Sequence, residues 1–242
     1  MELAERVAQV RARVDRACAA AGRDPADVRL MAVTKTHGLD LLEGAYGAGL
    51  RLFGENRVQE AAGKAAALAG HDDLRWAVIG HLQTNKVRSA LGFAAEFHAL
   101  DSLRLAEALD RRLQELGRGL DVFVQVNSSG EASKSGLEPS AVEQFALDLR
   151  PYTALRVRGL MTLAVYSDDT REVAACFVRM QELQARLRHL DAAAGCYDEL
   201  SMGMSGDFEL AIAHGATTVR VGQGLFGARP SPEVSDDADS NR

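Results

Sequence analysis

The sequence has no long apolar run, few cysteines and no excess of positive charge. No apolar stretch approaches the ~20 residues that a membrane-spanning helix needs. The three cysteines, Cys18, Cys176 and Cys196, lie far apart, which argues against a disulfide framework and is typical of a reducing compartment. The net charge of −6 argues against nucleic acid as the main partner. The charged start at residues 1–6 does not resemble a signal peptide, so we expect a cytoplasmic protein that binds neither membranes nor nucleic acid.

The sequence also lacks a recognisable group of metal ligands. No spacing among its histidines, cysteines and carboxylates is typical of a metal site. Hydrophobic residues make up 47% of the chain and charged residues 26%, as in an ordinary soluble globular protein. The 242 residues suffice for one large α/β domain or two small ones, and no second block of different composition is present.

Short apolar segments alternate with amphipathic segments along the chain. Residues 2–22, for example, place Val7, Val10 and Val14 on one stripe of a helix. Alternating βα units favour a parallel sheet, and eight units in about 230 residues are typical of a closed barrel. We therefore predict a single (β/α)8 TIM-type barrel over residues 1–229 and an acidic flexible tail over 230–242, with an open doubly wound sheet as the alternative. The predicted strands are 30–33, 50–54, 76–80, 97–100, 122–126, 157–160, 199–202 and 217–221.

The first predicted strand ends in a lysine. Residues 30–33 are all apolar, as in a strand buried on both faces, and Thr34 and Lys35 follow directly. In barrels the chemistry lies at the carboxyl ends of the strands. Partial burial lowers the pKa of a lysine, and a neutral amine condenses with an aldehyde to form a Schiff base. Taken alone, the segment fits an ordinary polar strand end better, and only the rest of the chain favours a reactive lysine.

Two glycine-rich segments follow the seventh and eighth predicted strands. Residues 200–207 and 219–227 each pass from a strand end into a loop with several glycines. Glycines let backbone N–H groups approach an anion, and barrels often bind phosphate with these two loops. Arg220 lies between two valines, so we expect its side chain to point away from theirs. The alternative is two ordinary glycine turns and a structural arginine, and we favour the phosphate site.

Residues 222–227 also match the glycine pattern of dinucleotide-binding proteins. That pattern requires a βαβ unit and an acidic residue about 20 positions further on. Only fifteen residues follow Gly227, and they include two prolines. We therefore reject a nicotinamide-binding fold.

A lysine at a barrel mouth together with a phosphate site indicates a phosphorylated aldehyde. Pyridoxal 5′-phosphate (PLP) bound to Lys35 is one such ligand. A class I aldolase that forms a transient imine with a sugar phosphate fits the same two features. The other polar strand ends are each explained as well by caps or turns. They are Asn56, His81, Lys86, His98, Asp101, Glu131, Lys134 and Thr162.

Seven motifs in order resemble the pyridoxal phosphate homeostasis proteins, whose barrel is related to the N-terminal domain of bacterial alanine racemase. The resemblance extends from about residue 28 to residue 229. Its motifs are residues 32–36 (AVTKT), 53–60 (FGENRVQE), 79–86 (IGHLQTNK), 98–102 (HALDS), 126–137 (VNSSGEASKSGL), 159–162 (GLMT) and 200–229.

The resemblance implies that Lys35 holds PLP as a Schiff base and that the protein binds, buffers and delivers the cofactor without established turnover. It implies phosphate contacts from Ser201 and its neighbours, and it places Arg220 near the ring nitrogen or the phosphate. We expect a monomer that meets PLP-dependent apo-enzymes transiently. Gln223 departs from the Thr or Ser of many members, as do Thr34 from a frequent Ser and Arg57 from a frequent aromatic residue. The candidate cofactor-binding residues are Lys35, Asn56, His81, Ser201, Met202, Ser205, Arg220, Gly222 and Gln223.

The sequence favours a carrier over an enzyme. Racemisation needs an acid/base group on each face of the cofactor, and Lys35 supplies only one. In related racemases a second domain brings a tyrosine, but here the βα units use nearly the whole chain, and only Tyr166 follows a strand end closely. A weak PLP-dependent amino-acid racemase is the alternative. A further hypothesis makes Lys86 and Lys134 a second, transient station for the cofactor during its transfer.

Overall fold

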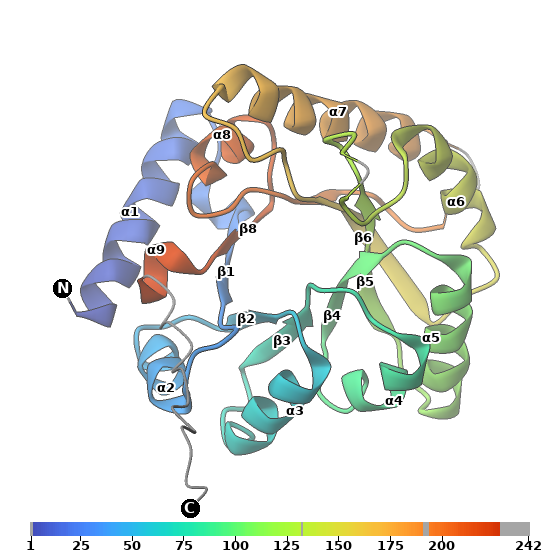
Figure 1. Ribbon diagram of the computed structural model, residues 1–242, viewed down its shortest axis with the longest axis horizontal. Coiled ribbons are helices and arrows are strands. Elements are labelled where there is room, and N and C mark those ends of the chain that lie inside the picture. Colours follow the sequence, from blue (N-terminus) through green and yellow to red (C-terminus); the bar gives the residue numbers. More distant parts are fainter. Residues whose placement is uncertain (1, 132, 191–193, 228–242) are drawn as a thin grey trace, which may run out of the picture.

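The structure is a computed structural model that describes residues 2–131, 133–190 and 194–227. Eight parallel strands close into a barrel in the order of the sequence, and Figure 1 shows the helices around its outside. The predicted (β/α)8 barrel is therefore confirmed. The predicted tail over 230–242 lies outside the described residues. The strands are β1 (Arg29–Val33), β2 (Leu52–Glu55), β3 (Arg75–Val78), β4 (Glu96–Leu100), β5 (Leu120–Val126), β6 (Leu155–Thr162), β7 (Glu199–Ser201) and β8 (Thr218–Val221).

The helices follow the predicted alternation, with one addition. A four-residue helix, α9, follows β8, where the sequence indicated only a glycine-rich turn, because one glycine within these four residues and one on each side give little helical preference. Among the described residues, no helix is long and apolar enough to cross a membrane. The helices are α1 (Leu3–Ala20), α2 (Leu39–Gly47), α3 (Val58–Ala67), α4 (Val87–Ala90), α5 (Leu103–Glu115), α6 (Val142–Asp148), α7 (Thr170–Arg188), α8 (Phe208–Ala213) and α9 (Gln223–Phe226).

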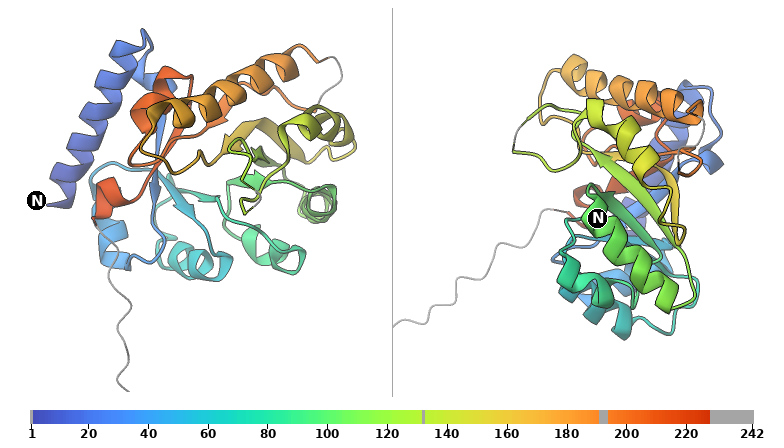
Figure 2. Two further views of the ribbon diagram at one scale, coloured as in Figure 1. Left: turned by 45° about the horizontal axis from the view of Figure 1, so that its top comes forward. Right: turned by 90° about the vertical axis from the view of Figure 1, so that its right-hand side faces the viewer.

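The first helix, α1, packs beside the last helices of the described chain. Its stripe of Val7, Val10, Val14 and Cys18 is buried as the spacing predicts. It packs against α8 and α9, and the left view of Figure 2 shows it beside these last helices. The Arg6 Nε also donates to the Leu225 carbonyl oxygen at 2.5 Å. The helix α9 is thus held from the outside of the barrel.

The barrel interior combines tight backbone packing with buried polar groups. A Cβ added at Gly159 in β6 would lie 1.8 Å from the carbonyl oxygen of Glu199 in β7, so only glycine fits there. Glu96, His98 and Arg220, on β4 and β8, are at most 3% exposed. These polar groups are inside a fold whose core is otherwise apolar, so each of them needs hydrogen-bond partners there.

Candidate functional site

Lys35 lies in the turn that follows β1 and is half-buried. Thr34 before it is fully buried, and its backbone N–H donates to the Gly54 carbonyl oxygen at 3.1 Å. Thr36 after it has a φ of 67°, a left-handed conformation that a β-branched residue rarely adopts. The backbone around Lys35 is therefore held in a conformation that its own residues do not favour.

A buried charged cluster lies beside this turn. Lys64 on α3 donates from Nζ to the Thr34 carbonyl oxygen at 2.7 Å, to Glu55 Oε1 at 2.7 Å and to Glu60 Oε1 at 2.6 Å. Glu55 also accepts from Thr34 Oγ1 at 2.6 Å, and Glu60 from the Thr36 N–H at 2.6 Å. Burial raises the pKa of Glu55, against the hydrogen bonds from Lys64 and Thr34.

Two of these residues were not predicted from the sequence. The buried stripe of α3 consists of Val58, Ala61 and Lys64. A lysine on an apolar stripe is the signal that identifies the cluster. Glu55 was interpreted as a loop residue, but it completes β2 because Lys64 and Thr34 neutralise and bond its carboxylate.

A chain of hydrogen bonds crosses the barrel interior from Arg220. Its Nη1 donates to Ser201 Oγ at 2.9 Å, and Ser201 Oγ lies 2.9 Å from His98 Nδ1. His98 Nε2 lies 2.9 Å from Glu96 Oε2, and Arg29 Nη1 donates to Glu96 Oε1 at 2.7 Å. The ionised carboxylate of Glu96 can only accept, so Nε2–H of His98 donates to it, and on the neutral ring Nδ1 then accepts the Ser201 hydroxyl proton. His98 was predicted to follow β4, whereas it lies inside that strand.

The charges along this chain are set by burial and by their neighbours. Burial lowers the pKa of His98, which favours the neutral ring that the hydrogen bonds require. Although burial acts to raise it, hydrogen bonds from His98 and Arg29 bring the pKa of Glu96 down to about 2. Burial lowers the pKa of Arg220 to about 10, so the guanidinium remains charged at neutral pH. Its Nη2 donates to the Thr162 carbonyl oxygen at 2.6 Å.

The two glycine-rich segments meet at the same barrel end. The Gly224 N–H donates to Ser205 Oγ at 3.2 Å, which joins the loop after β7 to the turn after β8. The following helix, α8, begins after Asp207, whose Oδ1 accepts from the Met204 N–H at 2.5 Å. Gly203 has a φ of 92°, and a Cβ there would lie 2.6 Å from that of Ala211, so the loop depends on glycine.

The remaining predicted residues lie around this end with different exposure. Asn56 follows β2, and its Oδ1 is buried with no hydrogen-bond partner in the described part of the chain. His81 is exposed near Asp101, where it opposes the burial that raises the pKa of that carboxyl. Met202 is fully buried and contributes a backbone N–H to the Thr218 carbonyl oxygen at 3.1 Å.

Gln223 and Gly222 form the start of α9, and Gln223 is exposed. The structure therefore brings the two loops together around Ser205 and Gly224 and commits the Ser201 hydroxyl to Arg220 and His98.

All four lysines of the chain belong to the carboxyl end of the barrel. Lys35 follows β1, Lys86 follows β3, and Lys134 follows β5, where it donates to the Ala164 carbonyl oxygen at 2.8 Å. Lys64 donates to the carbonyl oxygen of Thr34, before Lys35, and to Glu60, which accepts from the N–H of Thr36, after Lys35. Tyr166, the tyrosine with the best predicted access to this end, is 99% exposed.

Comparison with known proteins gives matches over nearly the whole chain. The family model described as alanine racemase, N-terminal domain, matches residues 6–230. The pyridoxal phosphate homeostasis protein of Pseudomonas aeruginosa is 44% identical over 227 residues, which are 94% of this chain and 96% of that protein. The protein of the same name from Aquifex aeolicus is 38% identical and covers 95% and 99% of the two chains.

Solved structures agree with the family match. The structure of PipY from Synechococcus elongatus with PLP bound has a TM-score of 0.82 at 38% identity, and the match covers 93% of this chain and all of PipY. Alanine racemase from Corynebacterium glutamicum has a TM-score of 0.71 at 16% identity, and the match covers 96% of this chain but 63% of the racemase. The second likeness shows the shared fold alone.

Proposed function

This chain belongs to the pyridoxal phosphate homeostasis protein family, and on that premise we propose that it binds PLP through Lys35 and delivers it to other proteins. The relatives carry the cofactor in their names, and PipY was solved with PLP bound. The observation that carries the proposal is the position of a half-buried lysine at the barrel end where the two glycine-rich loops are joined.

The residues present fit the cofactor. PLP needs an amine for its aldehyde, a cradle for its phosphate and polar groups around its ring. Lys35 supplies the amine, and the loops joined through Ser205 and Gly224 supply backbone near an anion. The orphaned buried oxygen of Asn56 indicates a polar group that a ligand or its bound water can satisfy.

We place Arg220 at the cofactor ring and the glycine loops at the phosphate. The guanidinium is inside the barrel, where Ser201 and the Thr162 carbonyl hold it, and it keeps its charge at neutral pH. When bound, the cofactor supplies an aldehyde and an electron-withdrawing ring. A cation beside the ring nitrogen disfavours its protonation and so weakens electron withdrawal. This arrangement suits a carrier better than a catalyst.

The absence of turnover is part of the proposal. Racemisation would need a second acid/base group opposite Lys35, and Tyr166 projects into solvent instead of packing over the site. We propose that the protein acts in the cytoplasm as a monomer and meets PLP-dependent apo-enzymes transiently.

Delivery can be measured directly. An apo-enzyme that requires PLP is mixed with the loaded protein as the sole source of cofactor, and recovery of its activity is followed with time. We expect reactivation at least as fast as with an equal amount of free PLP. Reactivation no faster than spontaneous loss of PLP into buffer would contradict delivery. Appearance of D-alanine from L-alanine above a Lys35→Ala control would instead support a racemase.

A further inference from the structure

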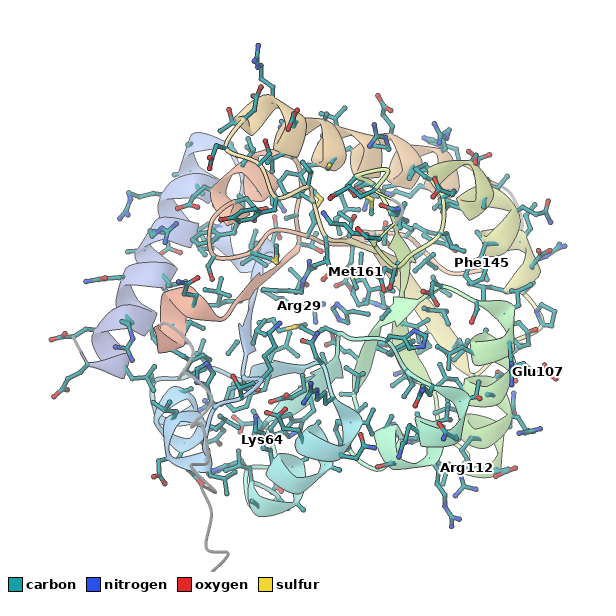
Figure 3. The ribbon with its side chains drawn as sticks, viewed as in Figure 1. Arg29, Lys64, Glu107, Arg112, Phe145 and Met161 are labelled. Atoms are coloured by element: carbon teal, nitrogen blue, oxygen red, sulfur yellow. The ribbon has the colours of Figure 1, made fainter. Side chains whose placement is uncertain are left out.

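Lys64 is a buried lysine whose hydrogen-bonding capacity is fully used. It is 9% exposed, and its Nζ donates to Thr34 O, Glu55 Oε1 and Glu60 Oε1 at 2.7, 2.7 and 2.6 Å. An ammonium has three N–H donors, so all three are engaged. Lys64 is therefore not poised to attack an aldehyde, and its effect on the site comes through the groups that it holds (Figure 3).

The cluster holds both peptide bonds that flank Lys35. The Thr34 carbonyl belongs to the peptide bond before Lys35 and accepts from Lys64. The Thr36 N–H belongs to the peptide bond after Lys35 and donates to Glu60. Because Lys64 also bonds to Glu60, the contacts close a ring around the Lys35 backbone. That ring fixes the direction in which the Lys35 side chain leaves the strand.

The held conformation is one that the turn does not favour by itself. Thr36 adopts a φ of 67°, and such residues persist only where neighbouring groups fix them. Glu60 supplies the acceptor for its N–H, and Glu55, fully buried, anchors the Thr34 hydroxyl at 2.6 Å. The geometry of residues 34–36 thus depends on side chains from β2 and α3.

We propose that Glu55, Glu60 and Lys64 form a positioning triad that directs the Lys35 amine toward the cofactor aldehyde. The inference rests on the proposed function, because it concerns the covalent bond between Lys35 and PLP. Linkage joins Lys35 Nζ to the aldehyde carbon and releases one water molecule. Its rate depends steeply on the approach of the two atoms, whereas phosphate and ring contacts come from other segments. The triad therefore controls linkage and leaves the remaining cofactor contacts unchanged.

Two ligands separate positioning from a general effect on folding. PLP has an aldehyde, and pyridoxine 5′-phosphate has an alcohol in its place and the same ring and phosphate. In Lys64→Met, which keeps the side-chain length and removes the donors, we expect PLP linkage to slow by about 10-fold or more in stopped-flow absorbance. We expect the affinity for pyridoxine 5′-phosphate to stay within about 2-fold of wild type, because Lys35 is not bonded to it.

Matched variants complete the test. Arg23→Met removes a partly buried cation that also holds backbone carbonyls, Ile212 O at 2.9 Å and Ala216 O at 2.8 Å, at the other barrel end. It should lower the melting temperature without slowing linkage. Glu60→Gln keeps an acceptor for the Thr36 N–H and should stay near wild type, whereas Glu60→Leu should be slow. If Lys64→Met fails to fold, the comparison of Glu60→Gln with Glu60→Leu still tests the proposal.

Three results are decisive. Wild-type linkage rates in Lys64→Met and Glu60→Leu would overturn the positioning triad. Equal loss of affinity for both ligands would also overturn it, because the cluster would then act on stability alone. A wild-type protein that forms no link with PLP would overturn the proposed function itself, and with it this inference.

Discussion

Charged side chains gather at both ends of the barrel, but their hydrogen bonds are satisfied to different degrees. At the amino-terminal end, Arg29 bonds to Glu96 at 2.7 Å and to Glu199 at 2.8 Å (Figure 3). At the carboxyl-terminal end, the buried Glu55 Oε2 and Asn56 Oδ1 have no hydrogen-bond partner among the described residues, whereas near the amino-terminal end the neutral hydroxyls of Tyr197 and Thr218 are buried without one. The left-handed Thr36 is at the same end.

The difference separates stability from binding. A saturated ionic cluster stabilises the fold and has no donor or acceptor left for a ligand. Orphaned acceptors and a strained turn cost free energy in the folded protein, and a bound ligand can offset part of it. In TIM barrels, side chains at the carboxyl ends of the strands carry function and those at the amino ends carry stability. Variants at the two ends should therefore change different measurements.

The largest effect is expected at the carboxyl end, in Lys35→Ala. Without this amine, borohydride reduction should leave no PLP attached to the chain, and the absorption band of the linked cofactor should disappear. The melting temperature should change by less than about 2 °C, because Lys35 is not a core residue. Intact-mass measurement after reduction checks the first outcome, and calorimetry the second. Retained stoichiometric attachment would show that another amine is the anchor.

The next effect is expected near the amino end, in Gly159→Ala. A Cβ there would lie 1.8 Å from the Glu199 carbonyl oxygen, so β6 and β7 must separate. We expect a loss of more than about 3 kcal/mol in the free energy of unfolding, measured in urea. Gly63→Ala is the control, because it has open space around it within α3 and should stabilise by roughly 0.5–1 kcal/mol. Equal stability of the two variants would contradict the close approach of these strands.

A smaller effect at the amino end depends on pH. The folded state lowers the pKa of Glu96 from 4.5 to about 2. A depressed carboxyl pKa stabilises the fold above the unfolded pKa, and that stability is lost as the pH falls from 4.5 toward 2. The full loss is at most about 3 kcal/mol. Glu96→Gln should be less stable at pH 7 and should show a flatter decline in acid, as followed by urea unfolding at each pH. If the free energy of unfolding falls with pH as steeply in Glu96→Gln as in wild type, a group other than Glu96 causes the loss of stability in acid.

The smallest effect is expected at the carboxyl end, in Gln223→Thr. A threonine at the start of α9 adds a hydroxyl that can donate to the phosphate, as in many members of the family. One added hydrogen bond of about 1 kcal/mol corresponds to roughly 5-fold tighter binding. Equilibrium dialysis with PLP and with inorganic phosphate measures this change in affinity. Weaker binding than wild type would indicate that Gln223 already contacts the ligand.

The barrel was predictable from the sequence because its signals are local. The stripe of α1 and the apolar run of β1 depend on residues a few positions apart, and both are found where the periodicity places them. The position of Lys35 after β1 was predictable because an apolar run precedes it, and its role as the anchor of PLP stays a prediction. The joined loops were predictable because their glycines come after the last two strands.

The polar interior was not predictable, because its partners are far apart in the chain. His98 lies 103 residues from Ser201, and Arg29 lies 67 residues from Glu96. In the sequence, a buried charged residue whose partner is distant cannot be distinguished from a charged residue in an exposed loop. The phosphate contact of Ser201, which the resemblance implied, stays a prediction, and the structure shows its hydroxyl bonded to Arg220 and His98.

The distribution of the lysines has a chemical consequence. The chain has four lysines and carries its other basic charges on arginine, and the three lysines other than Lys35 are engaged or lie at the same barrel end. A free aldehyde condenses with amines, whereas the guanidinium of arginine stays protonated and does not act as a nucleophile at neutral pH. The outer surface of the described barrel therefore offers an aldehyde few places for unspecific adducts.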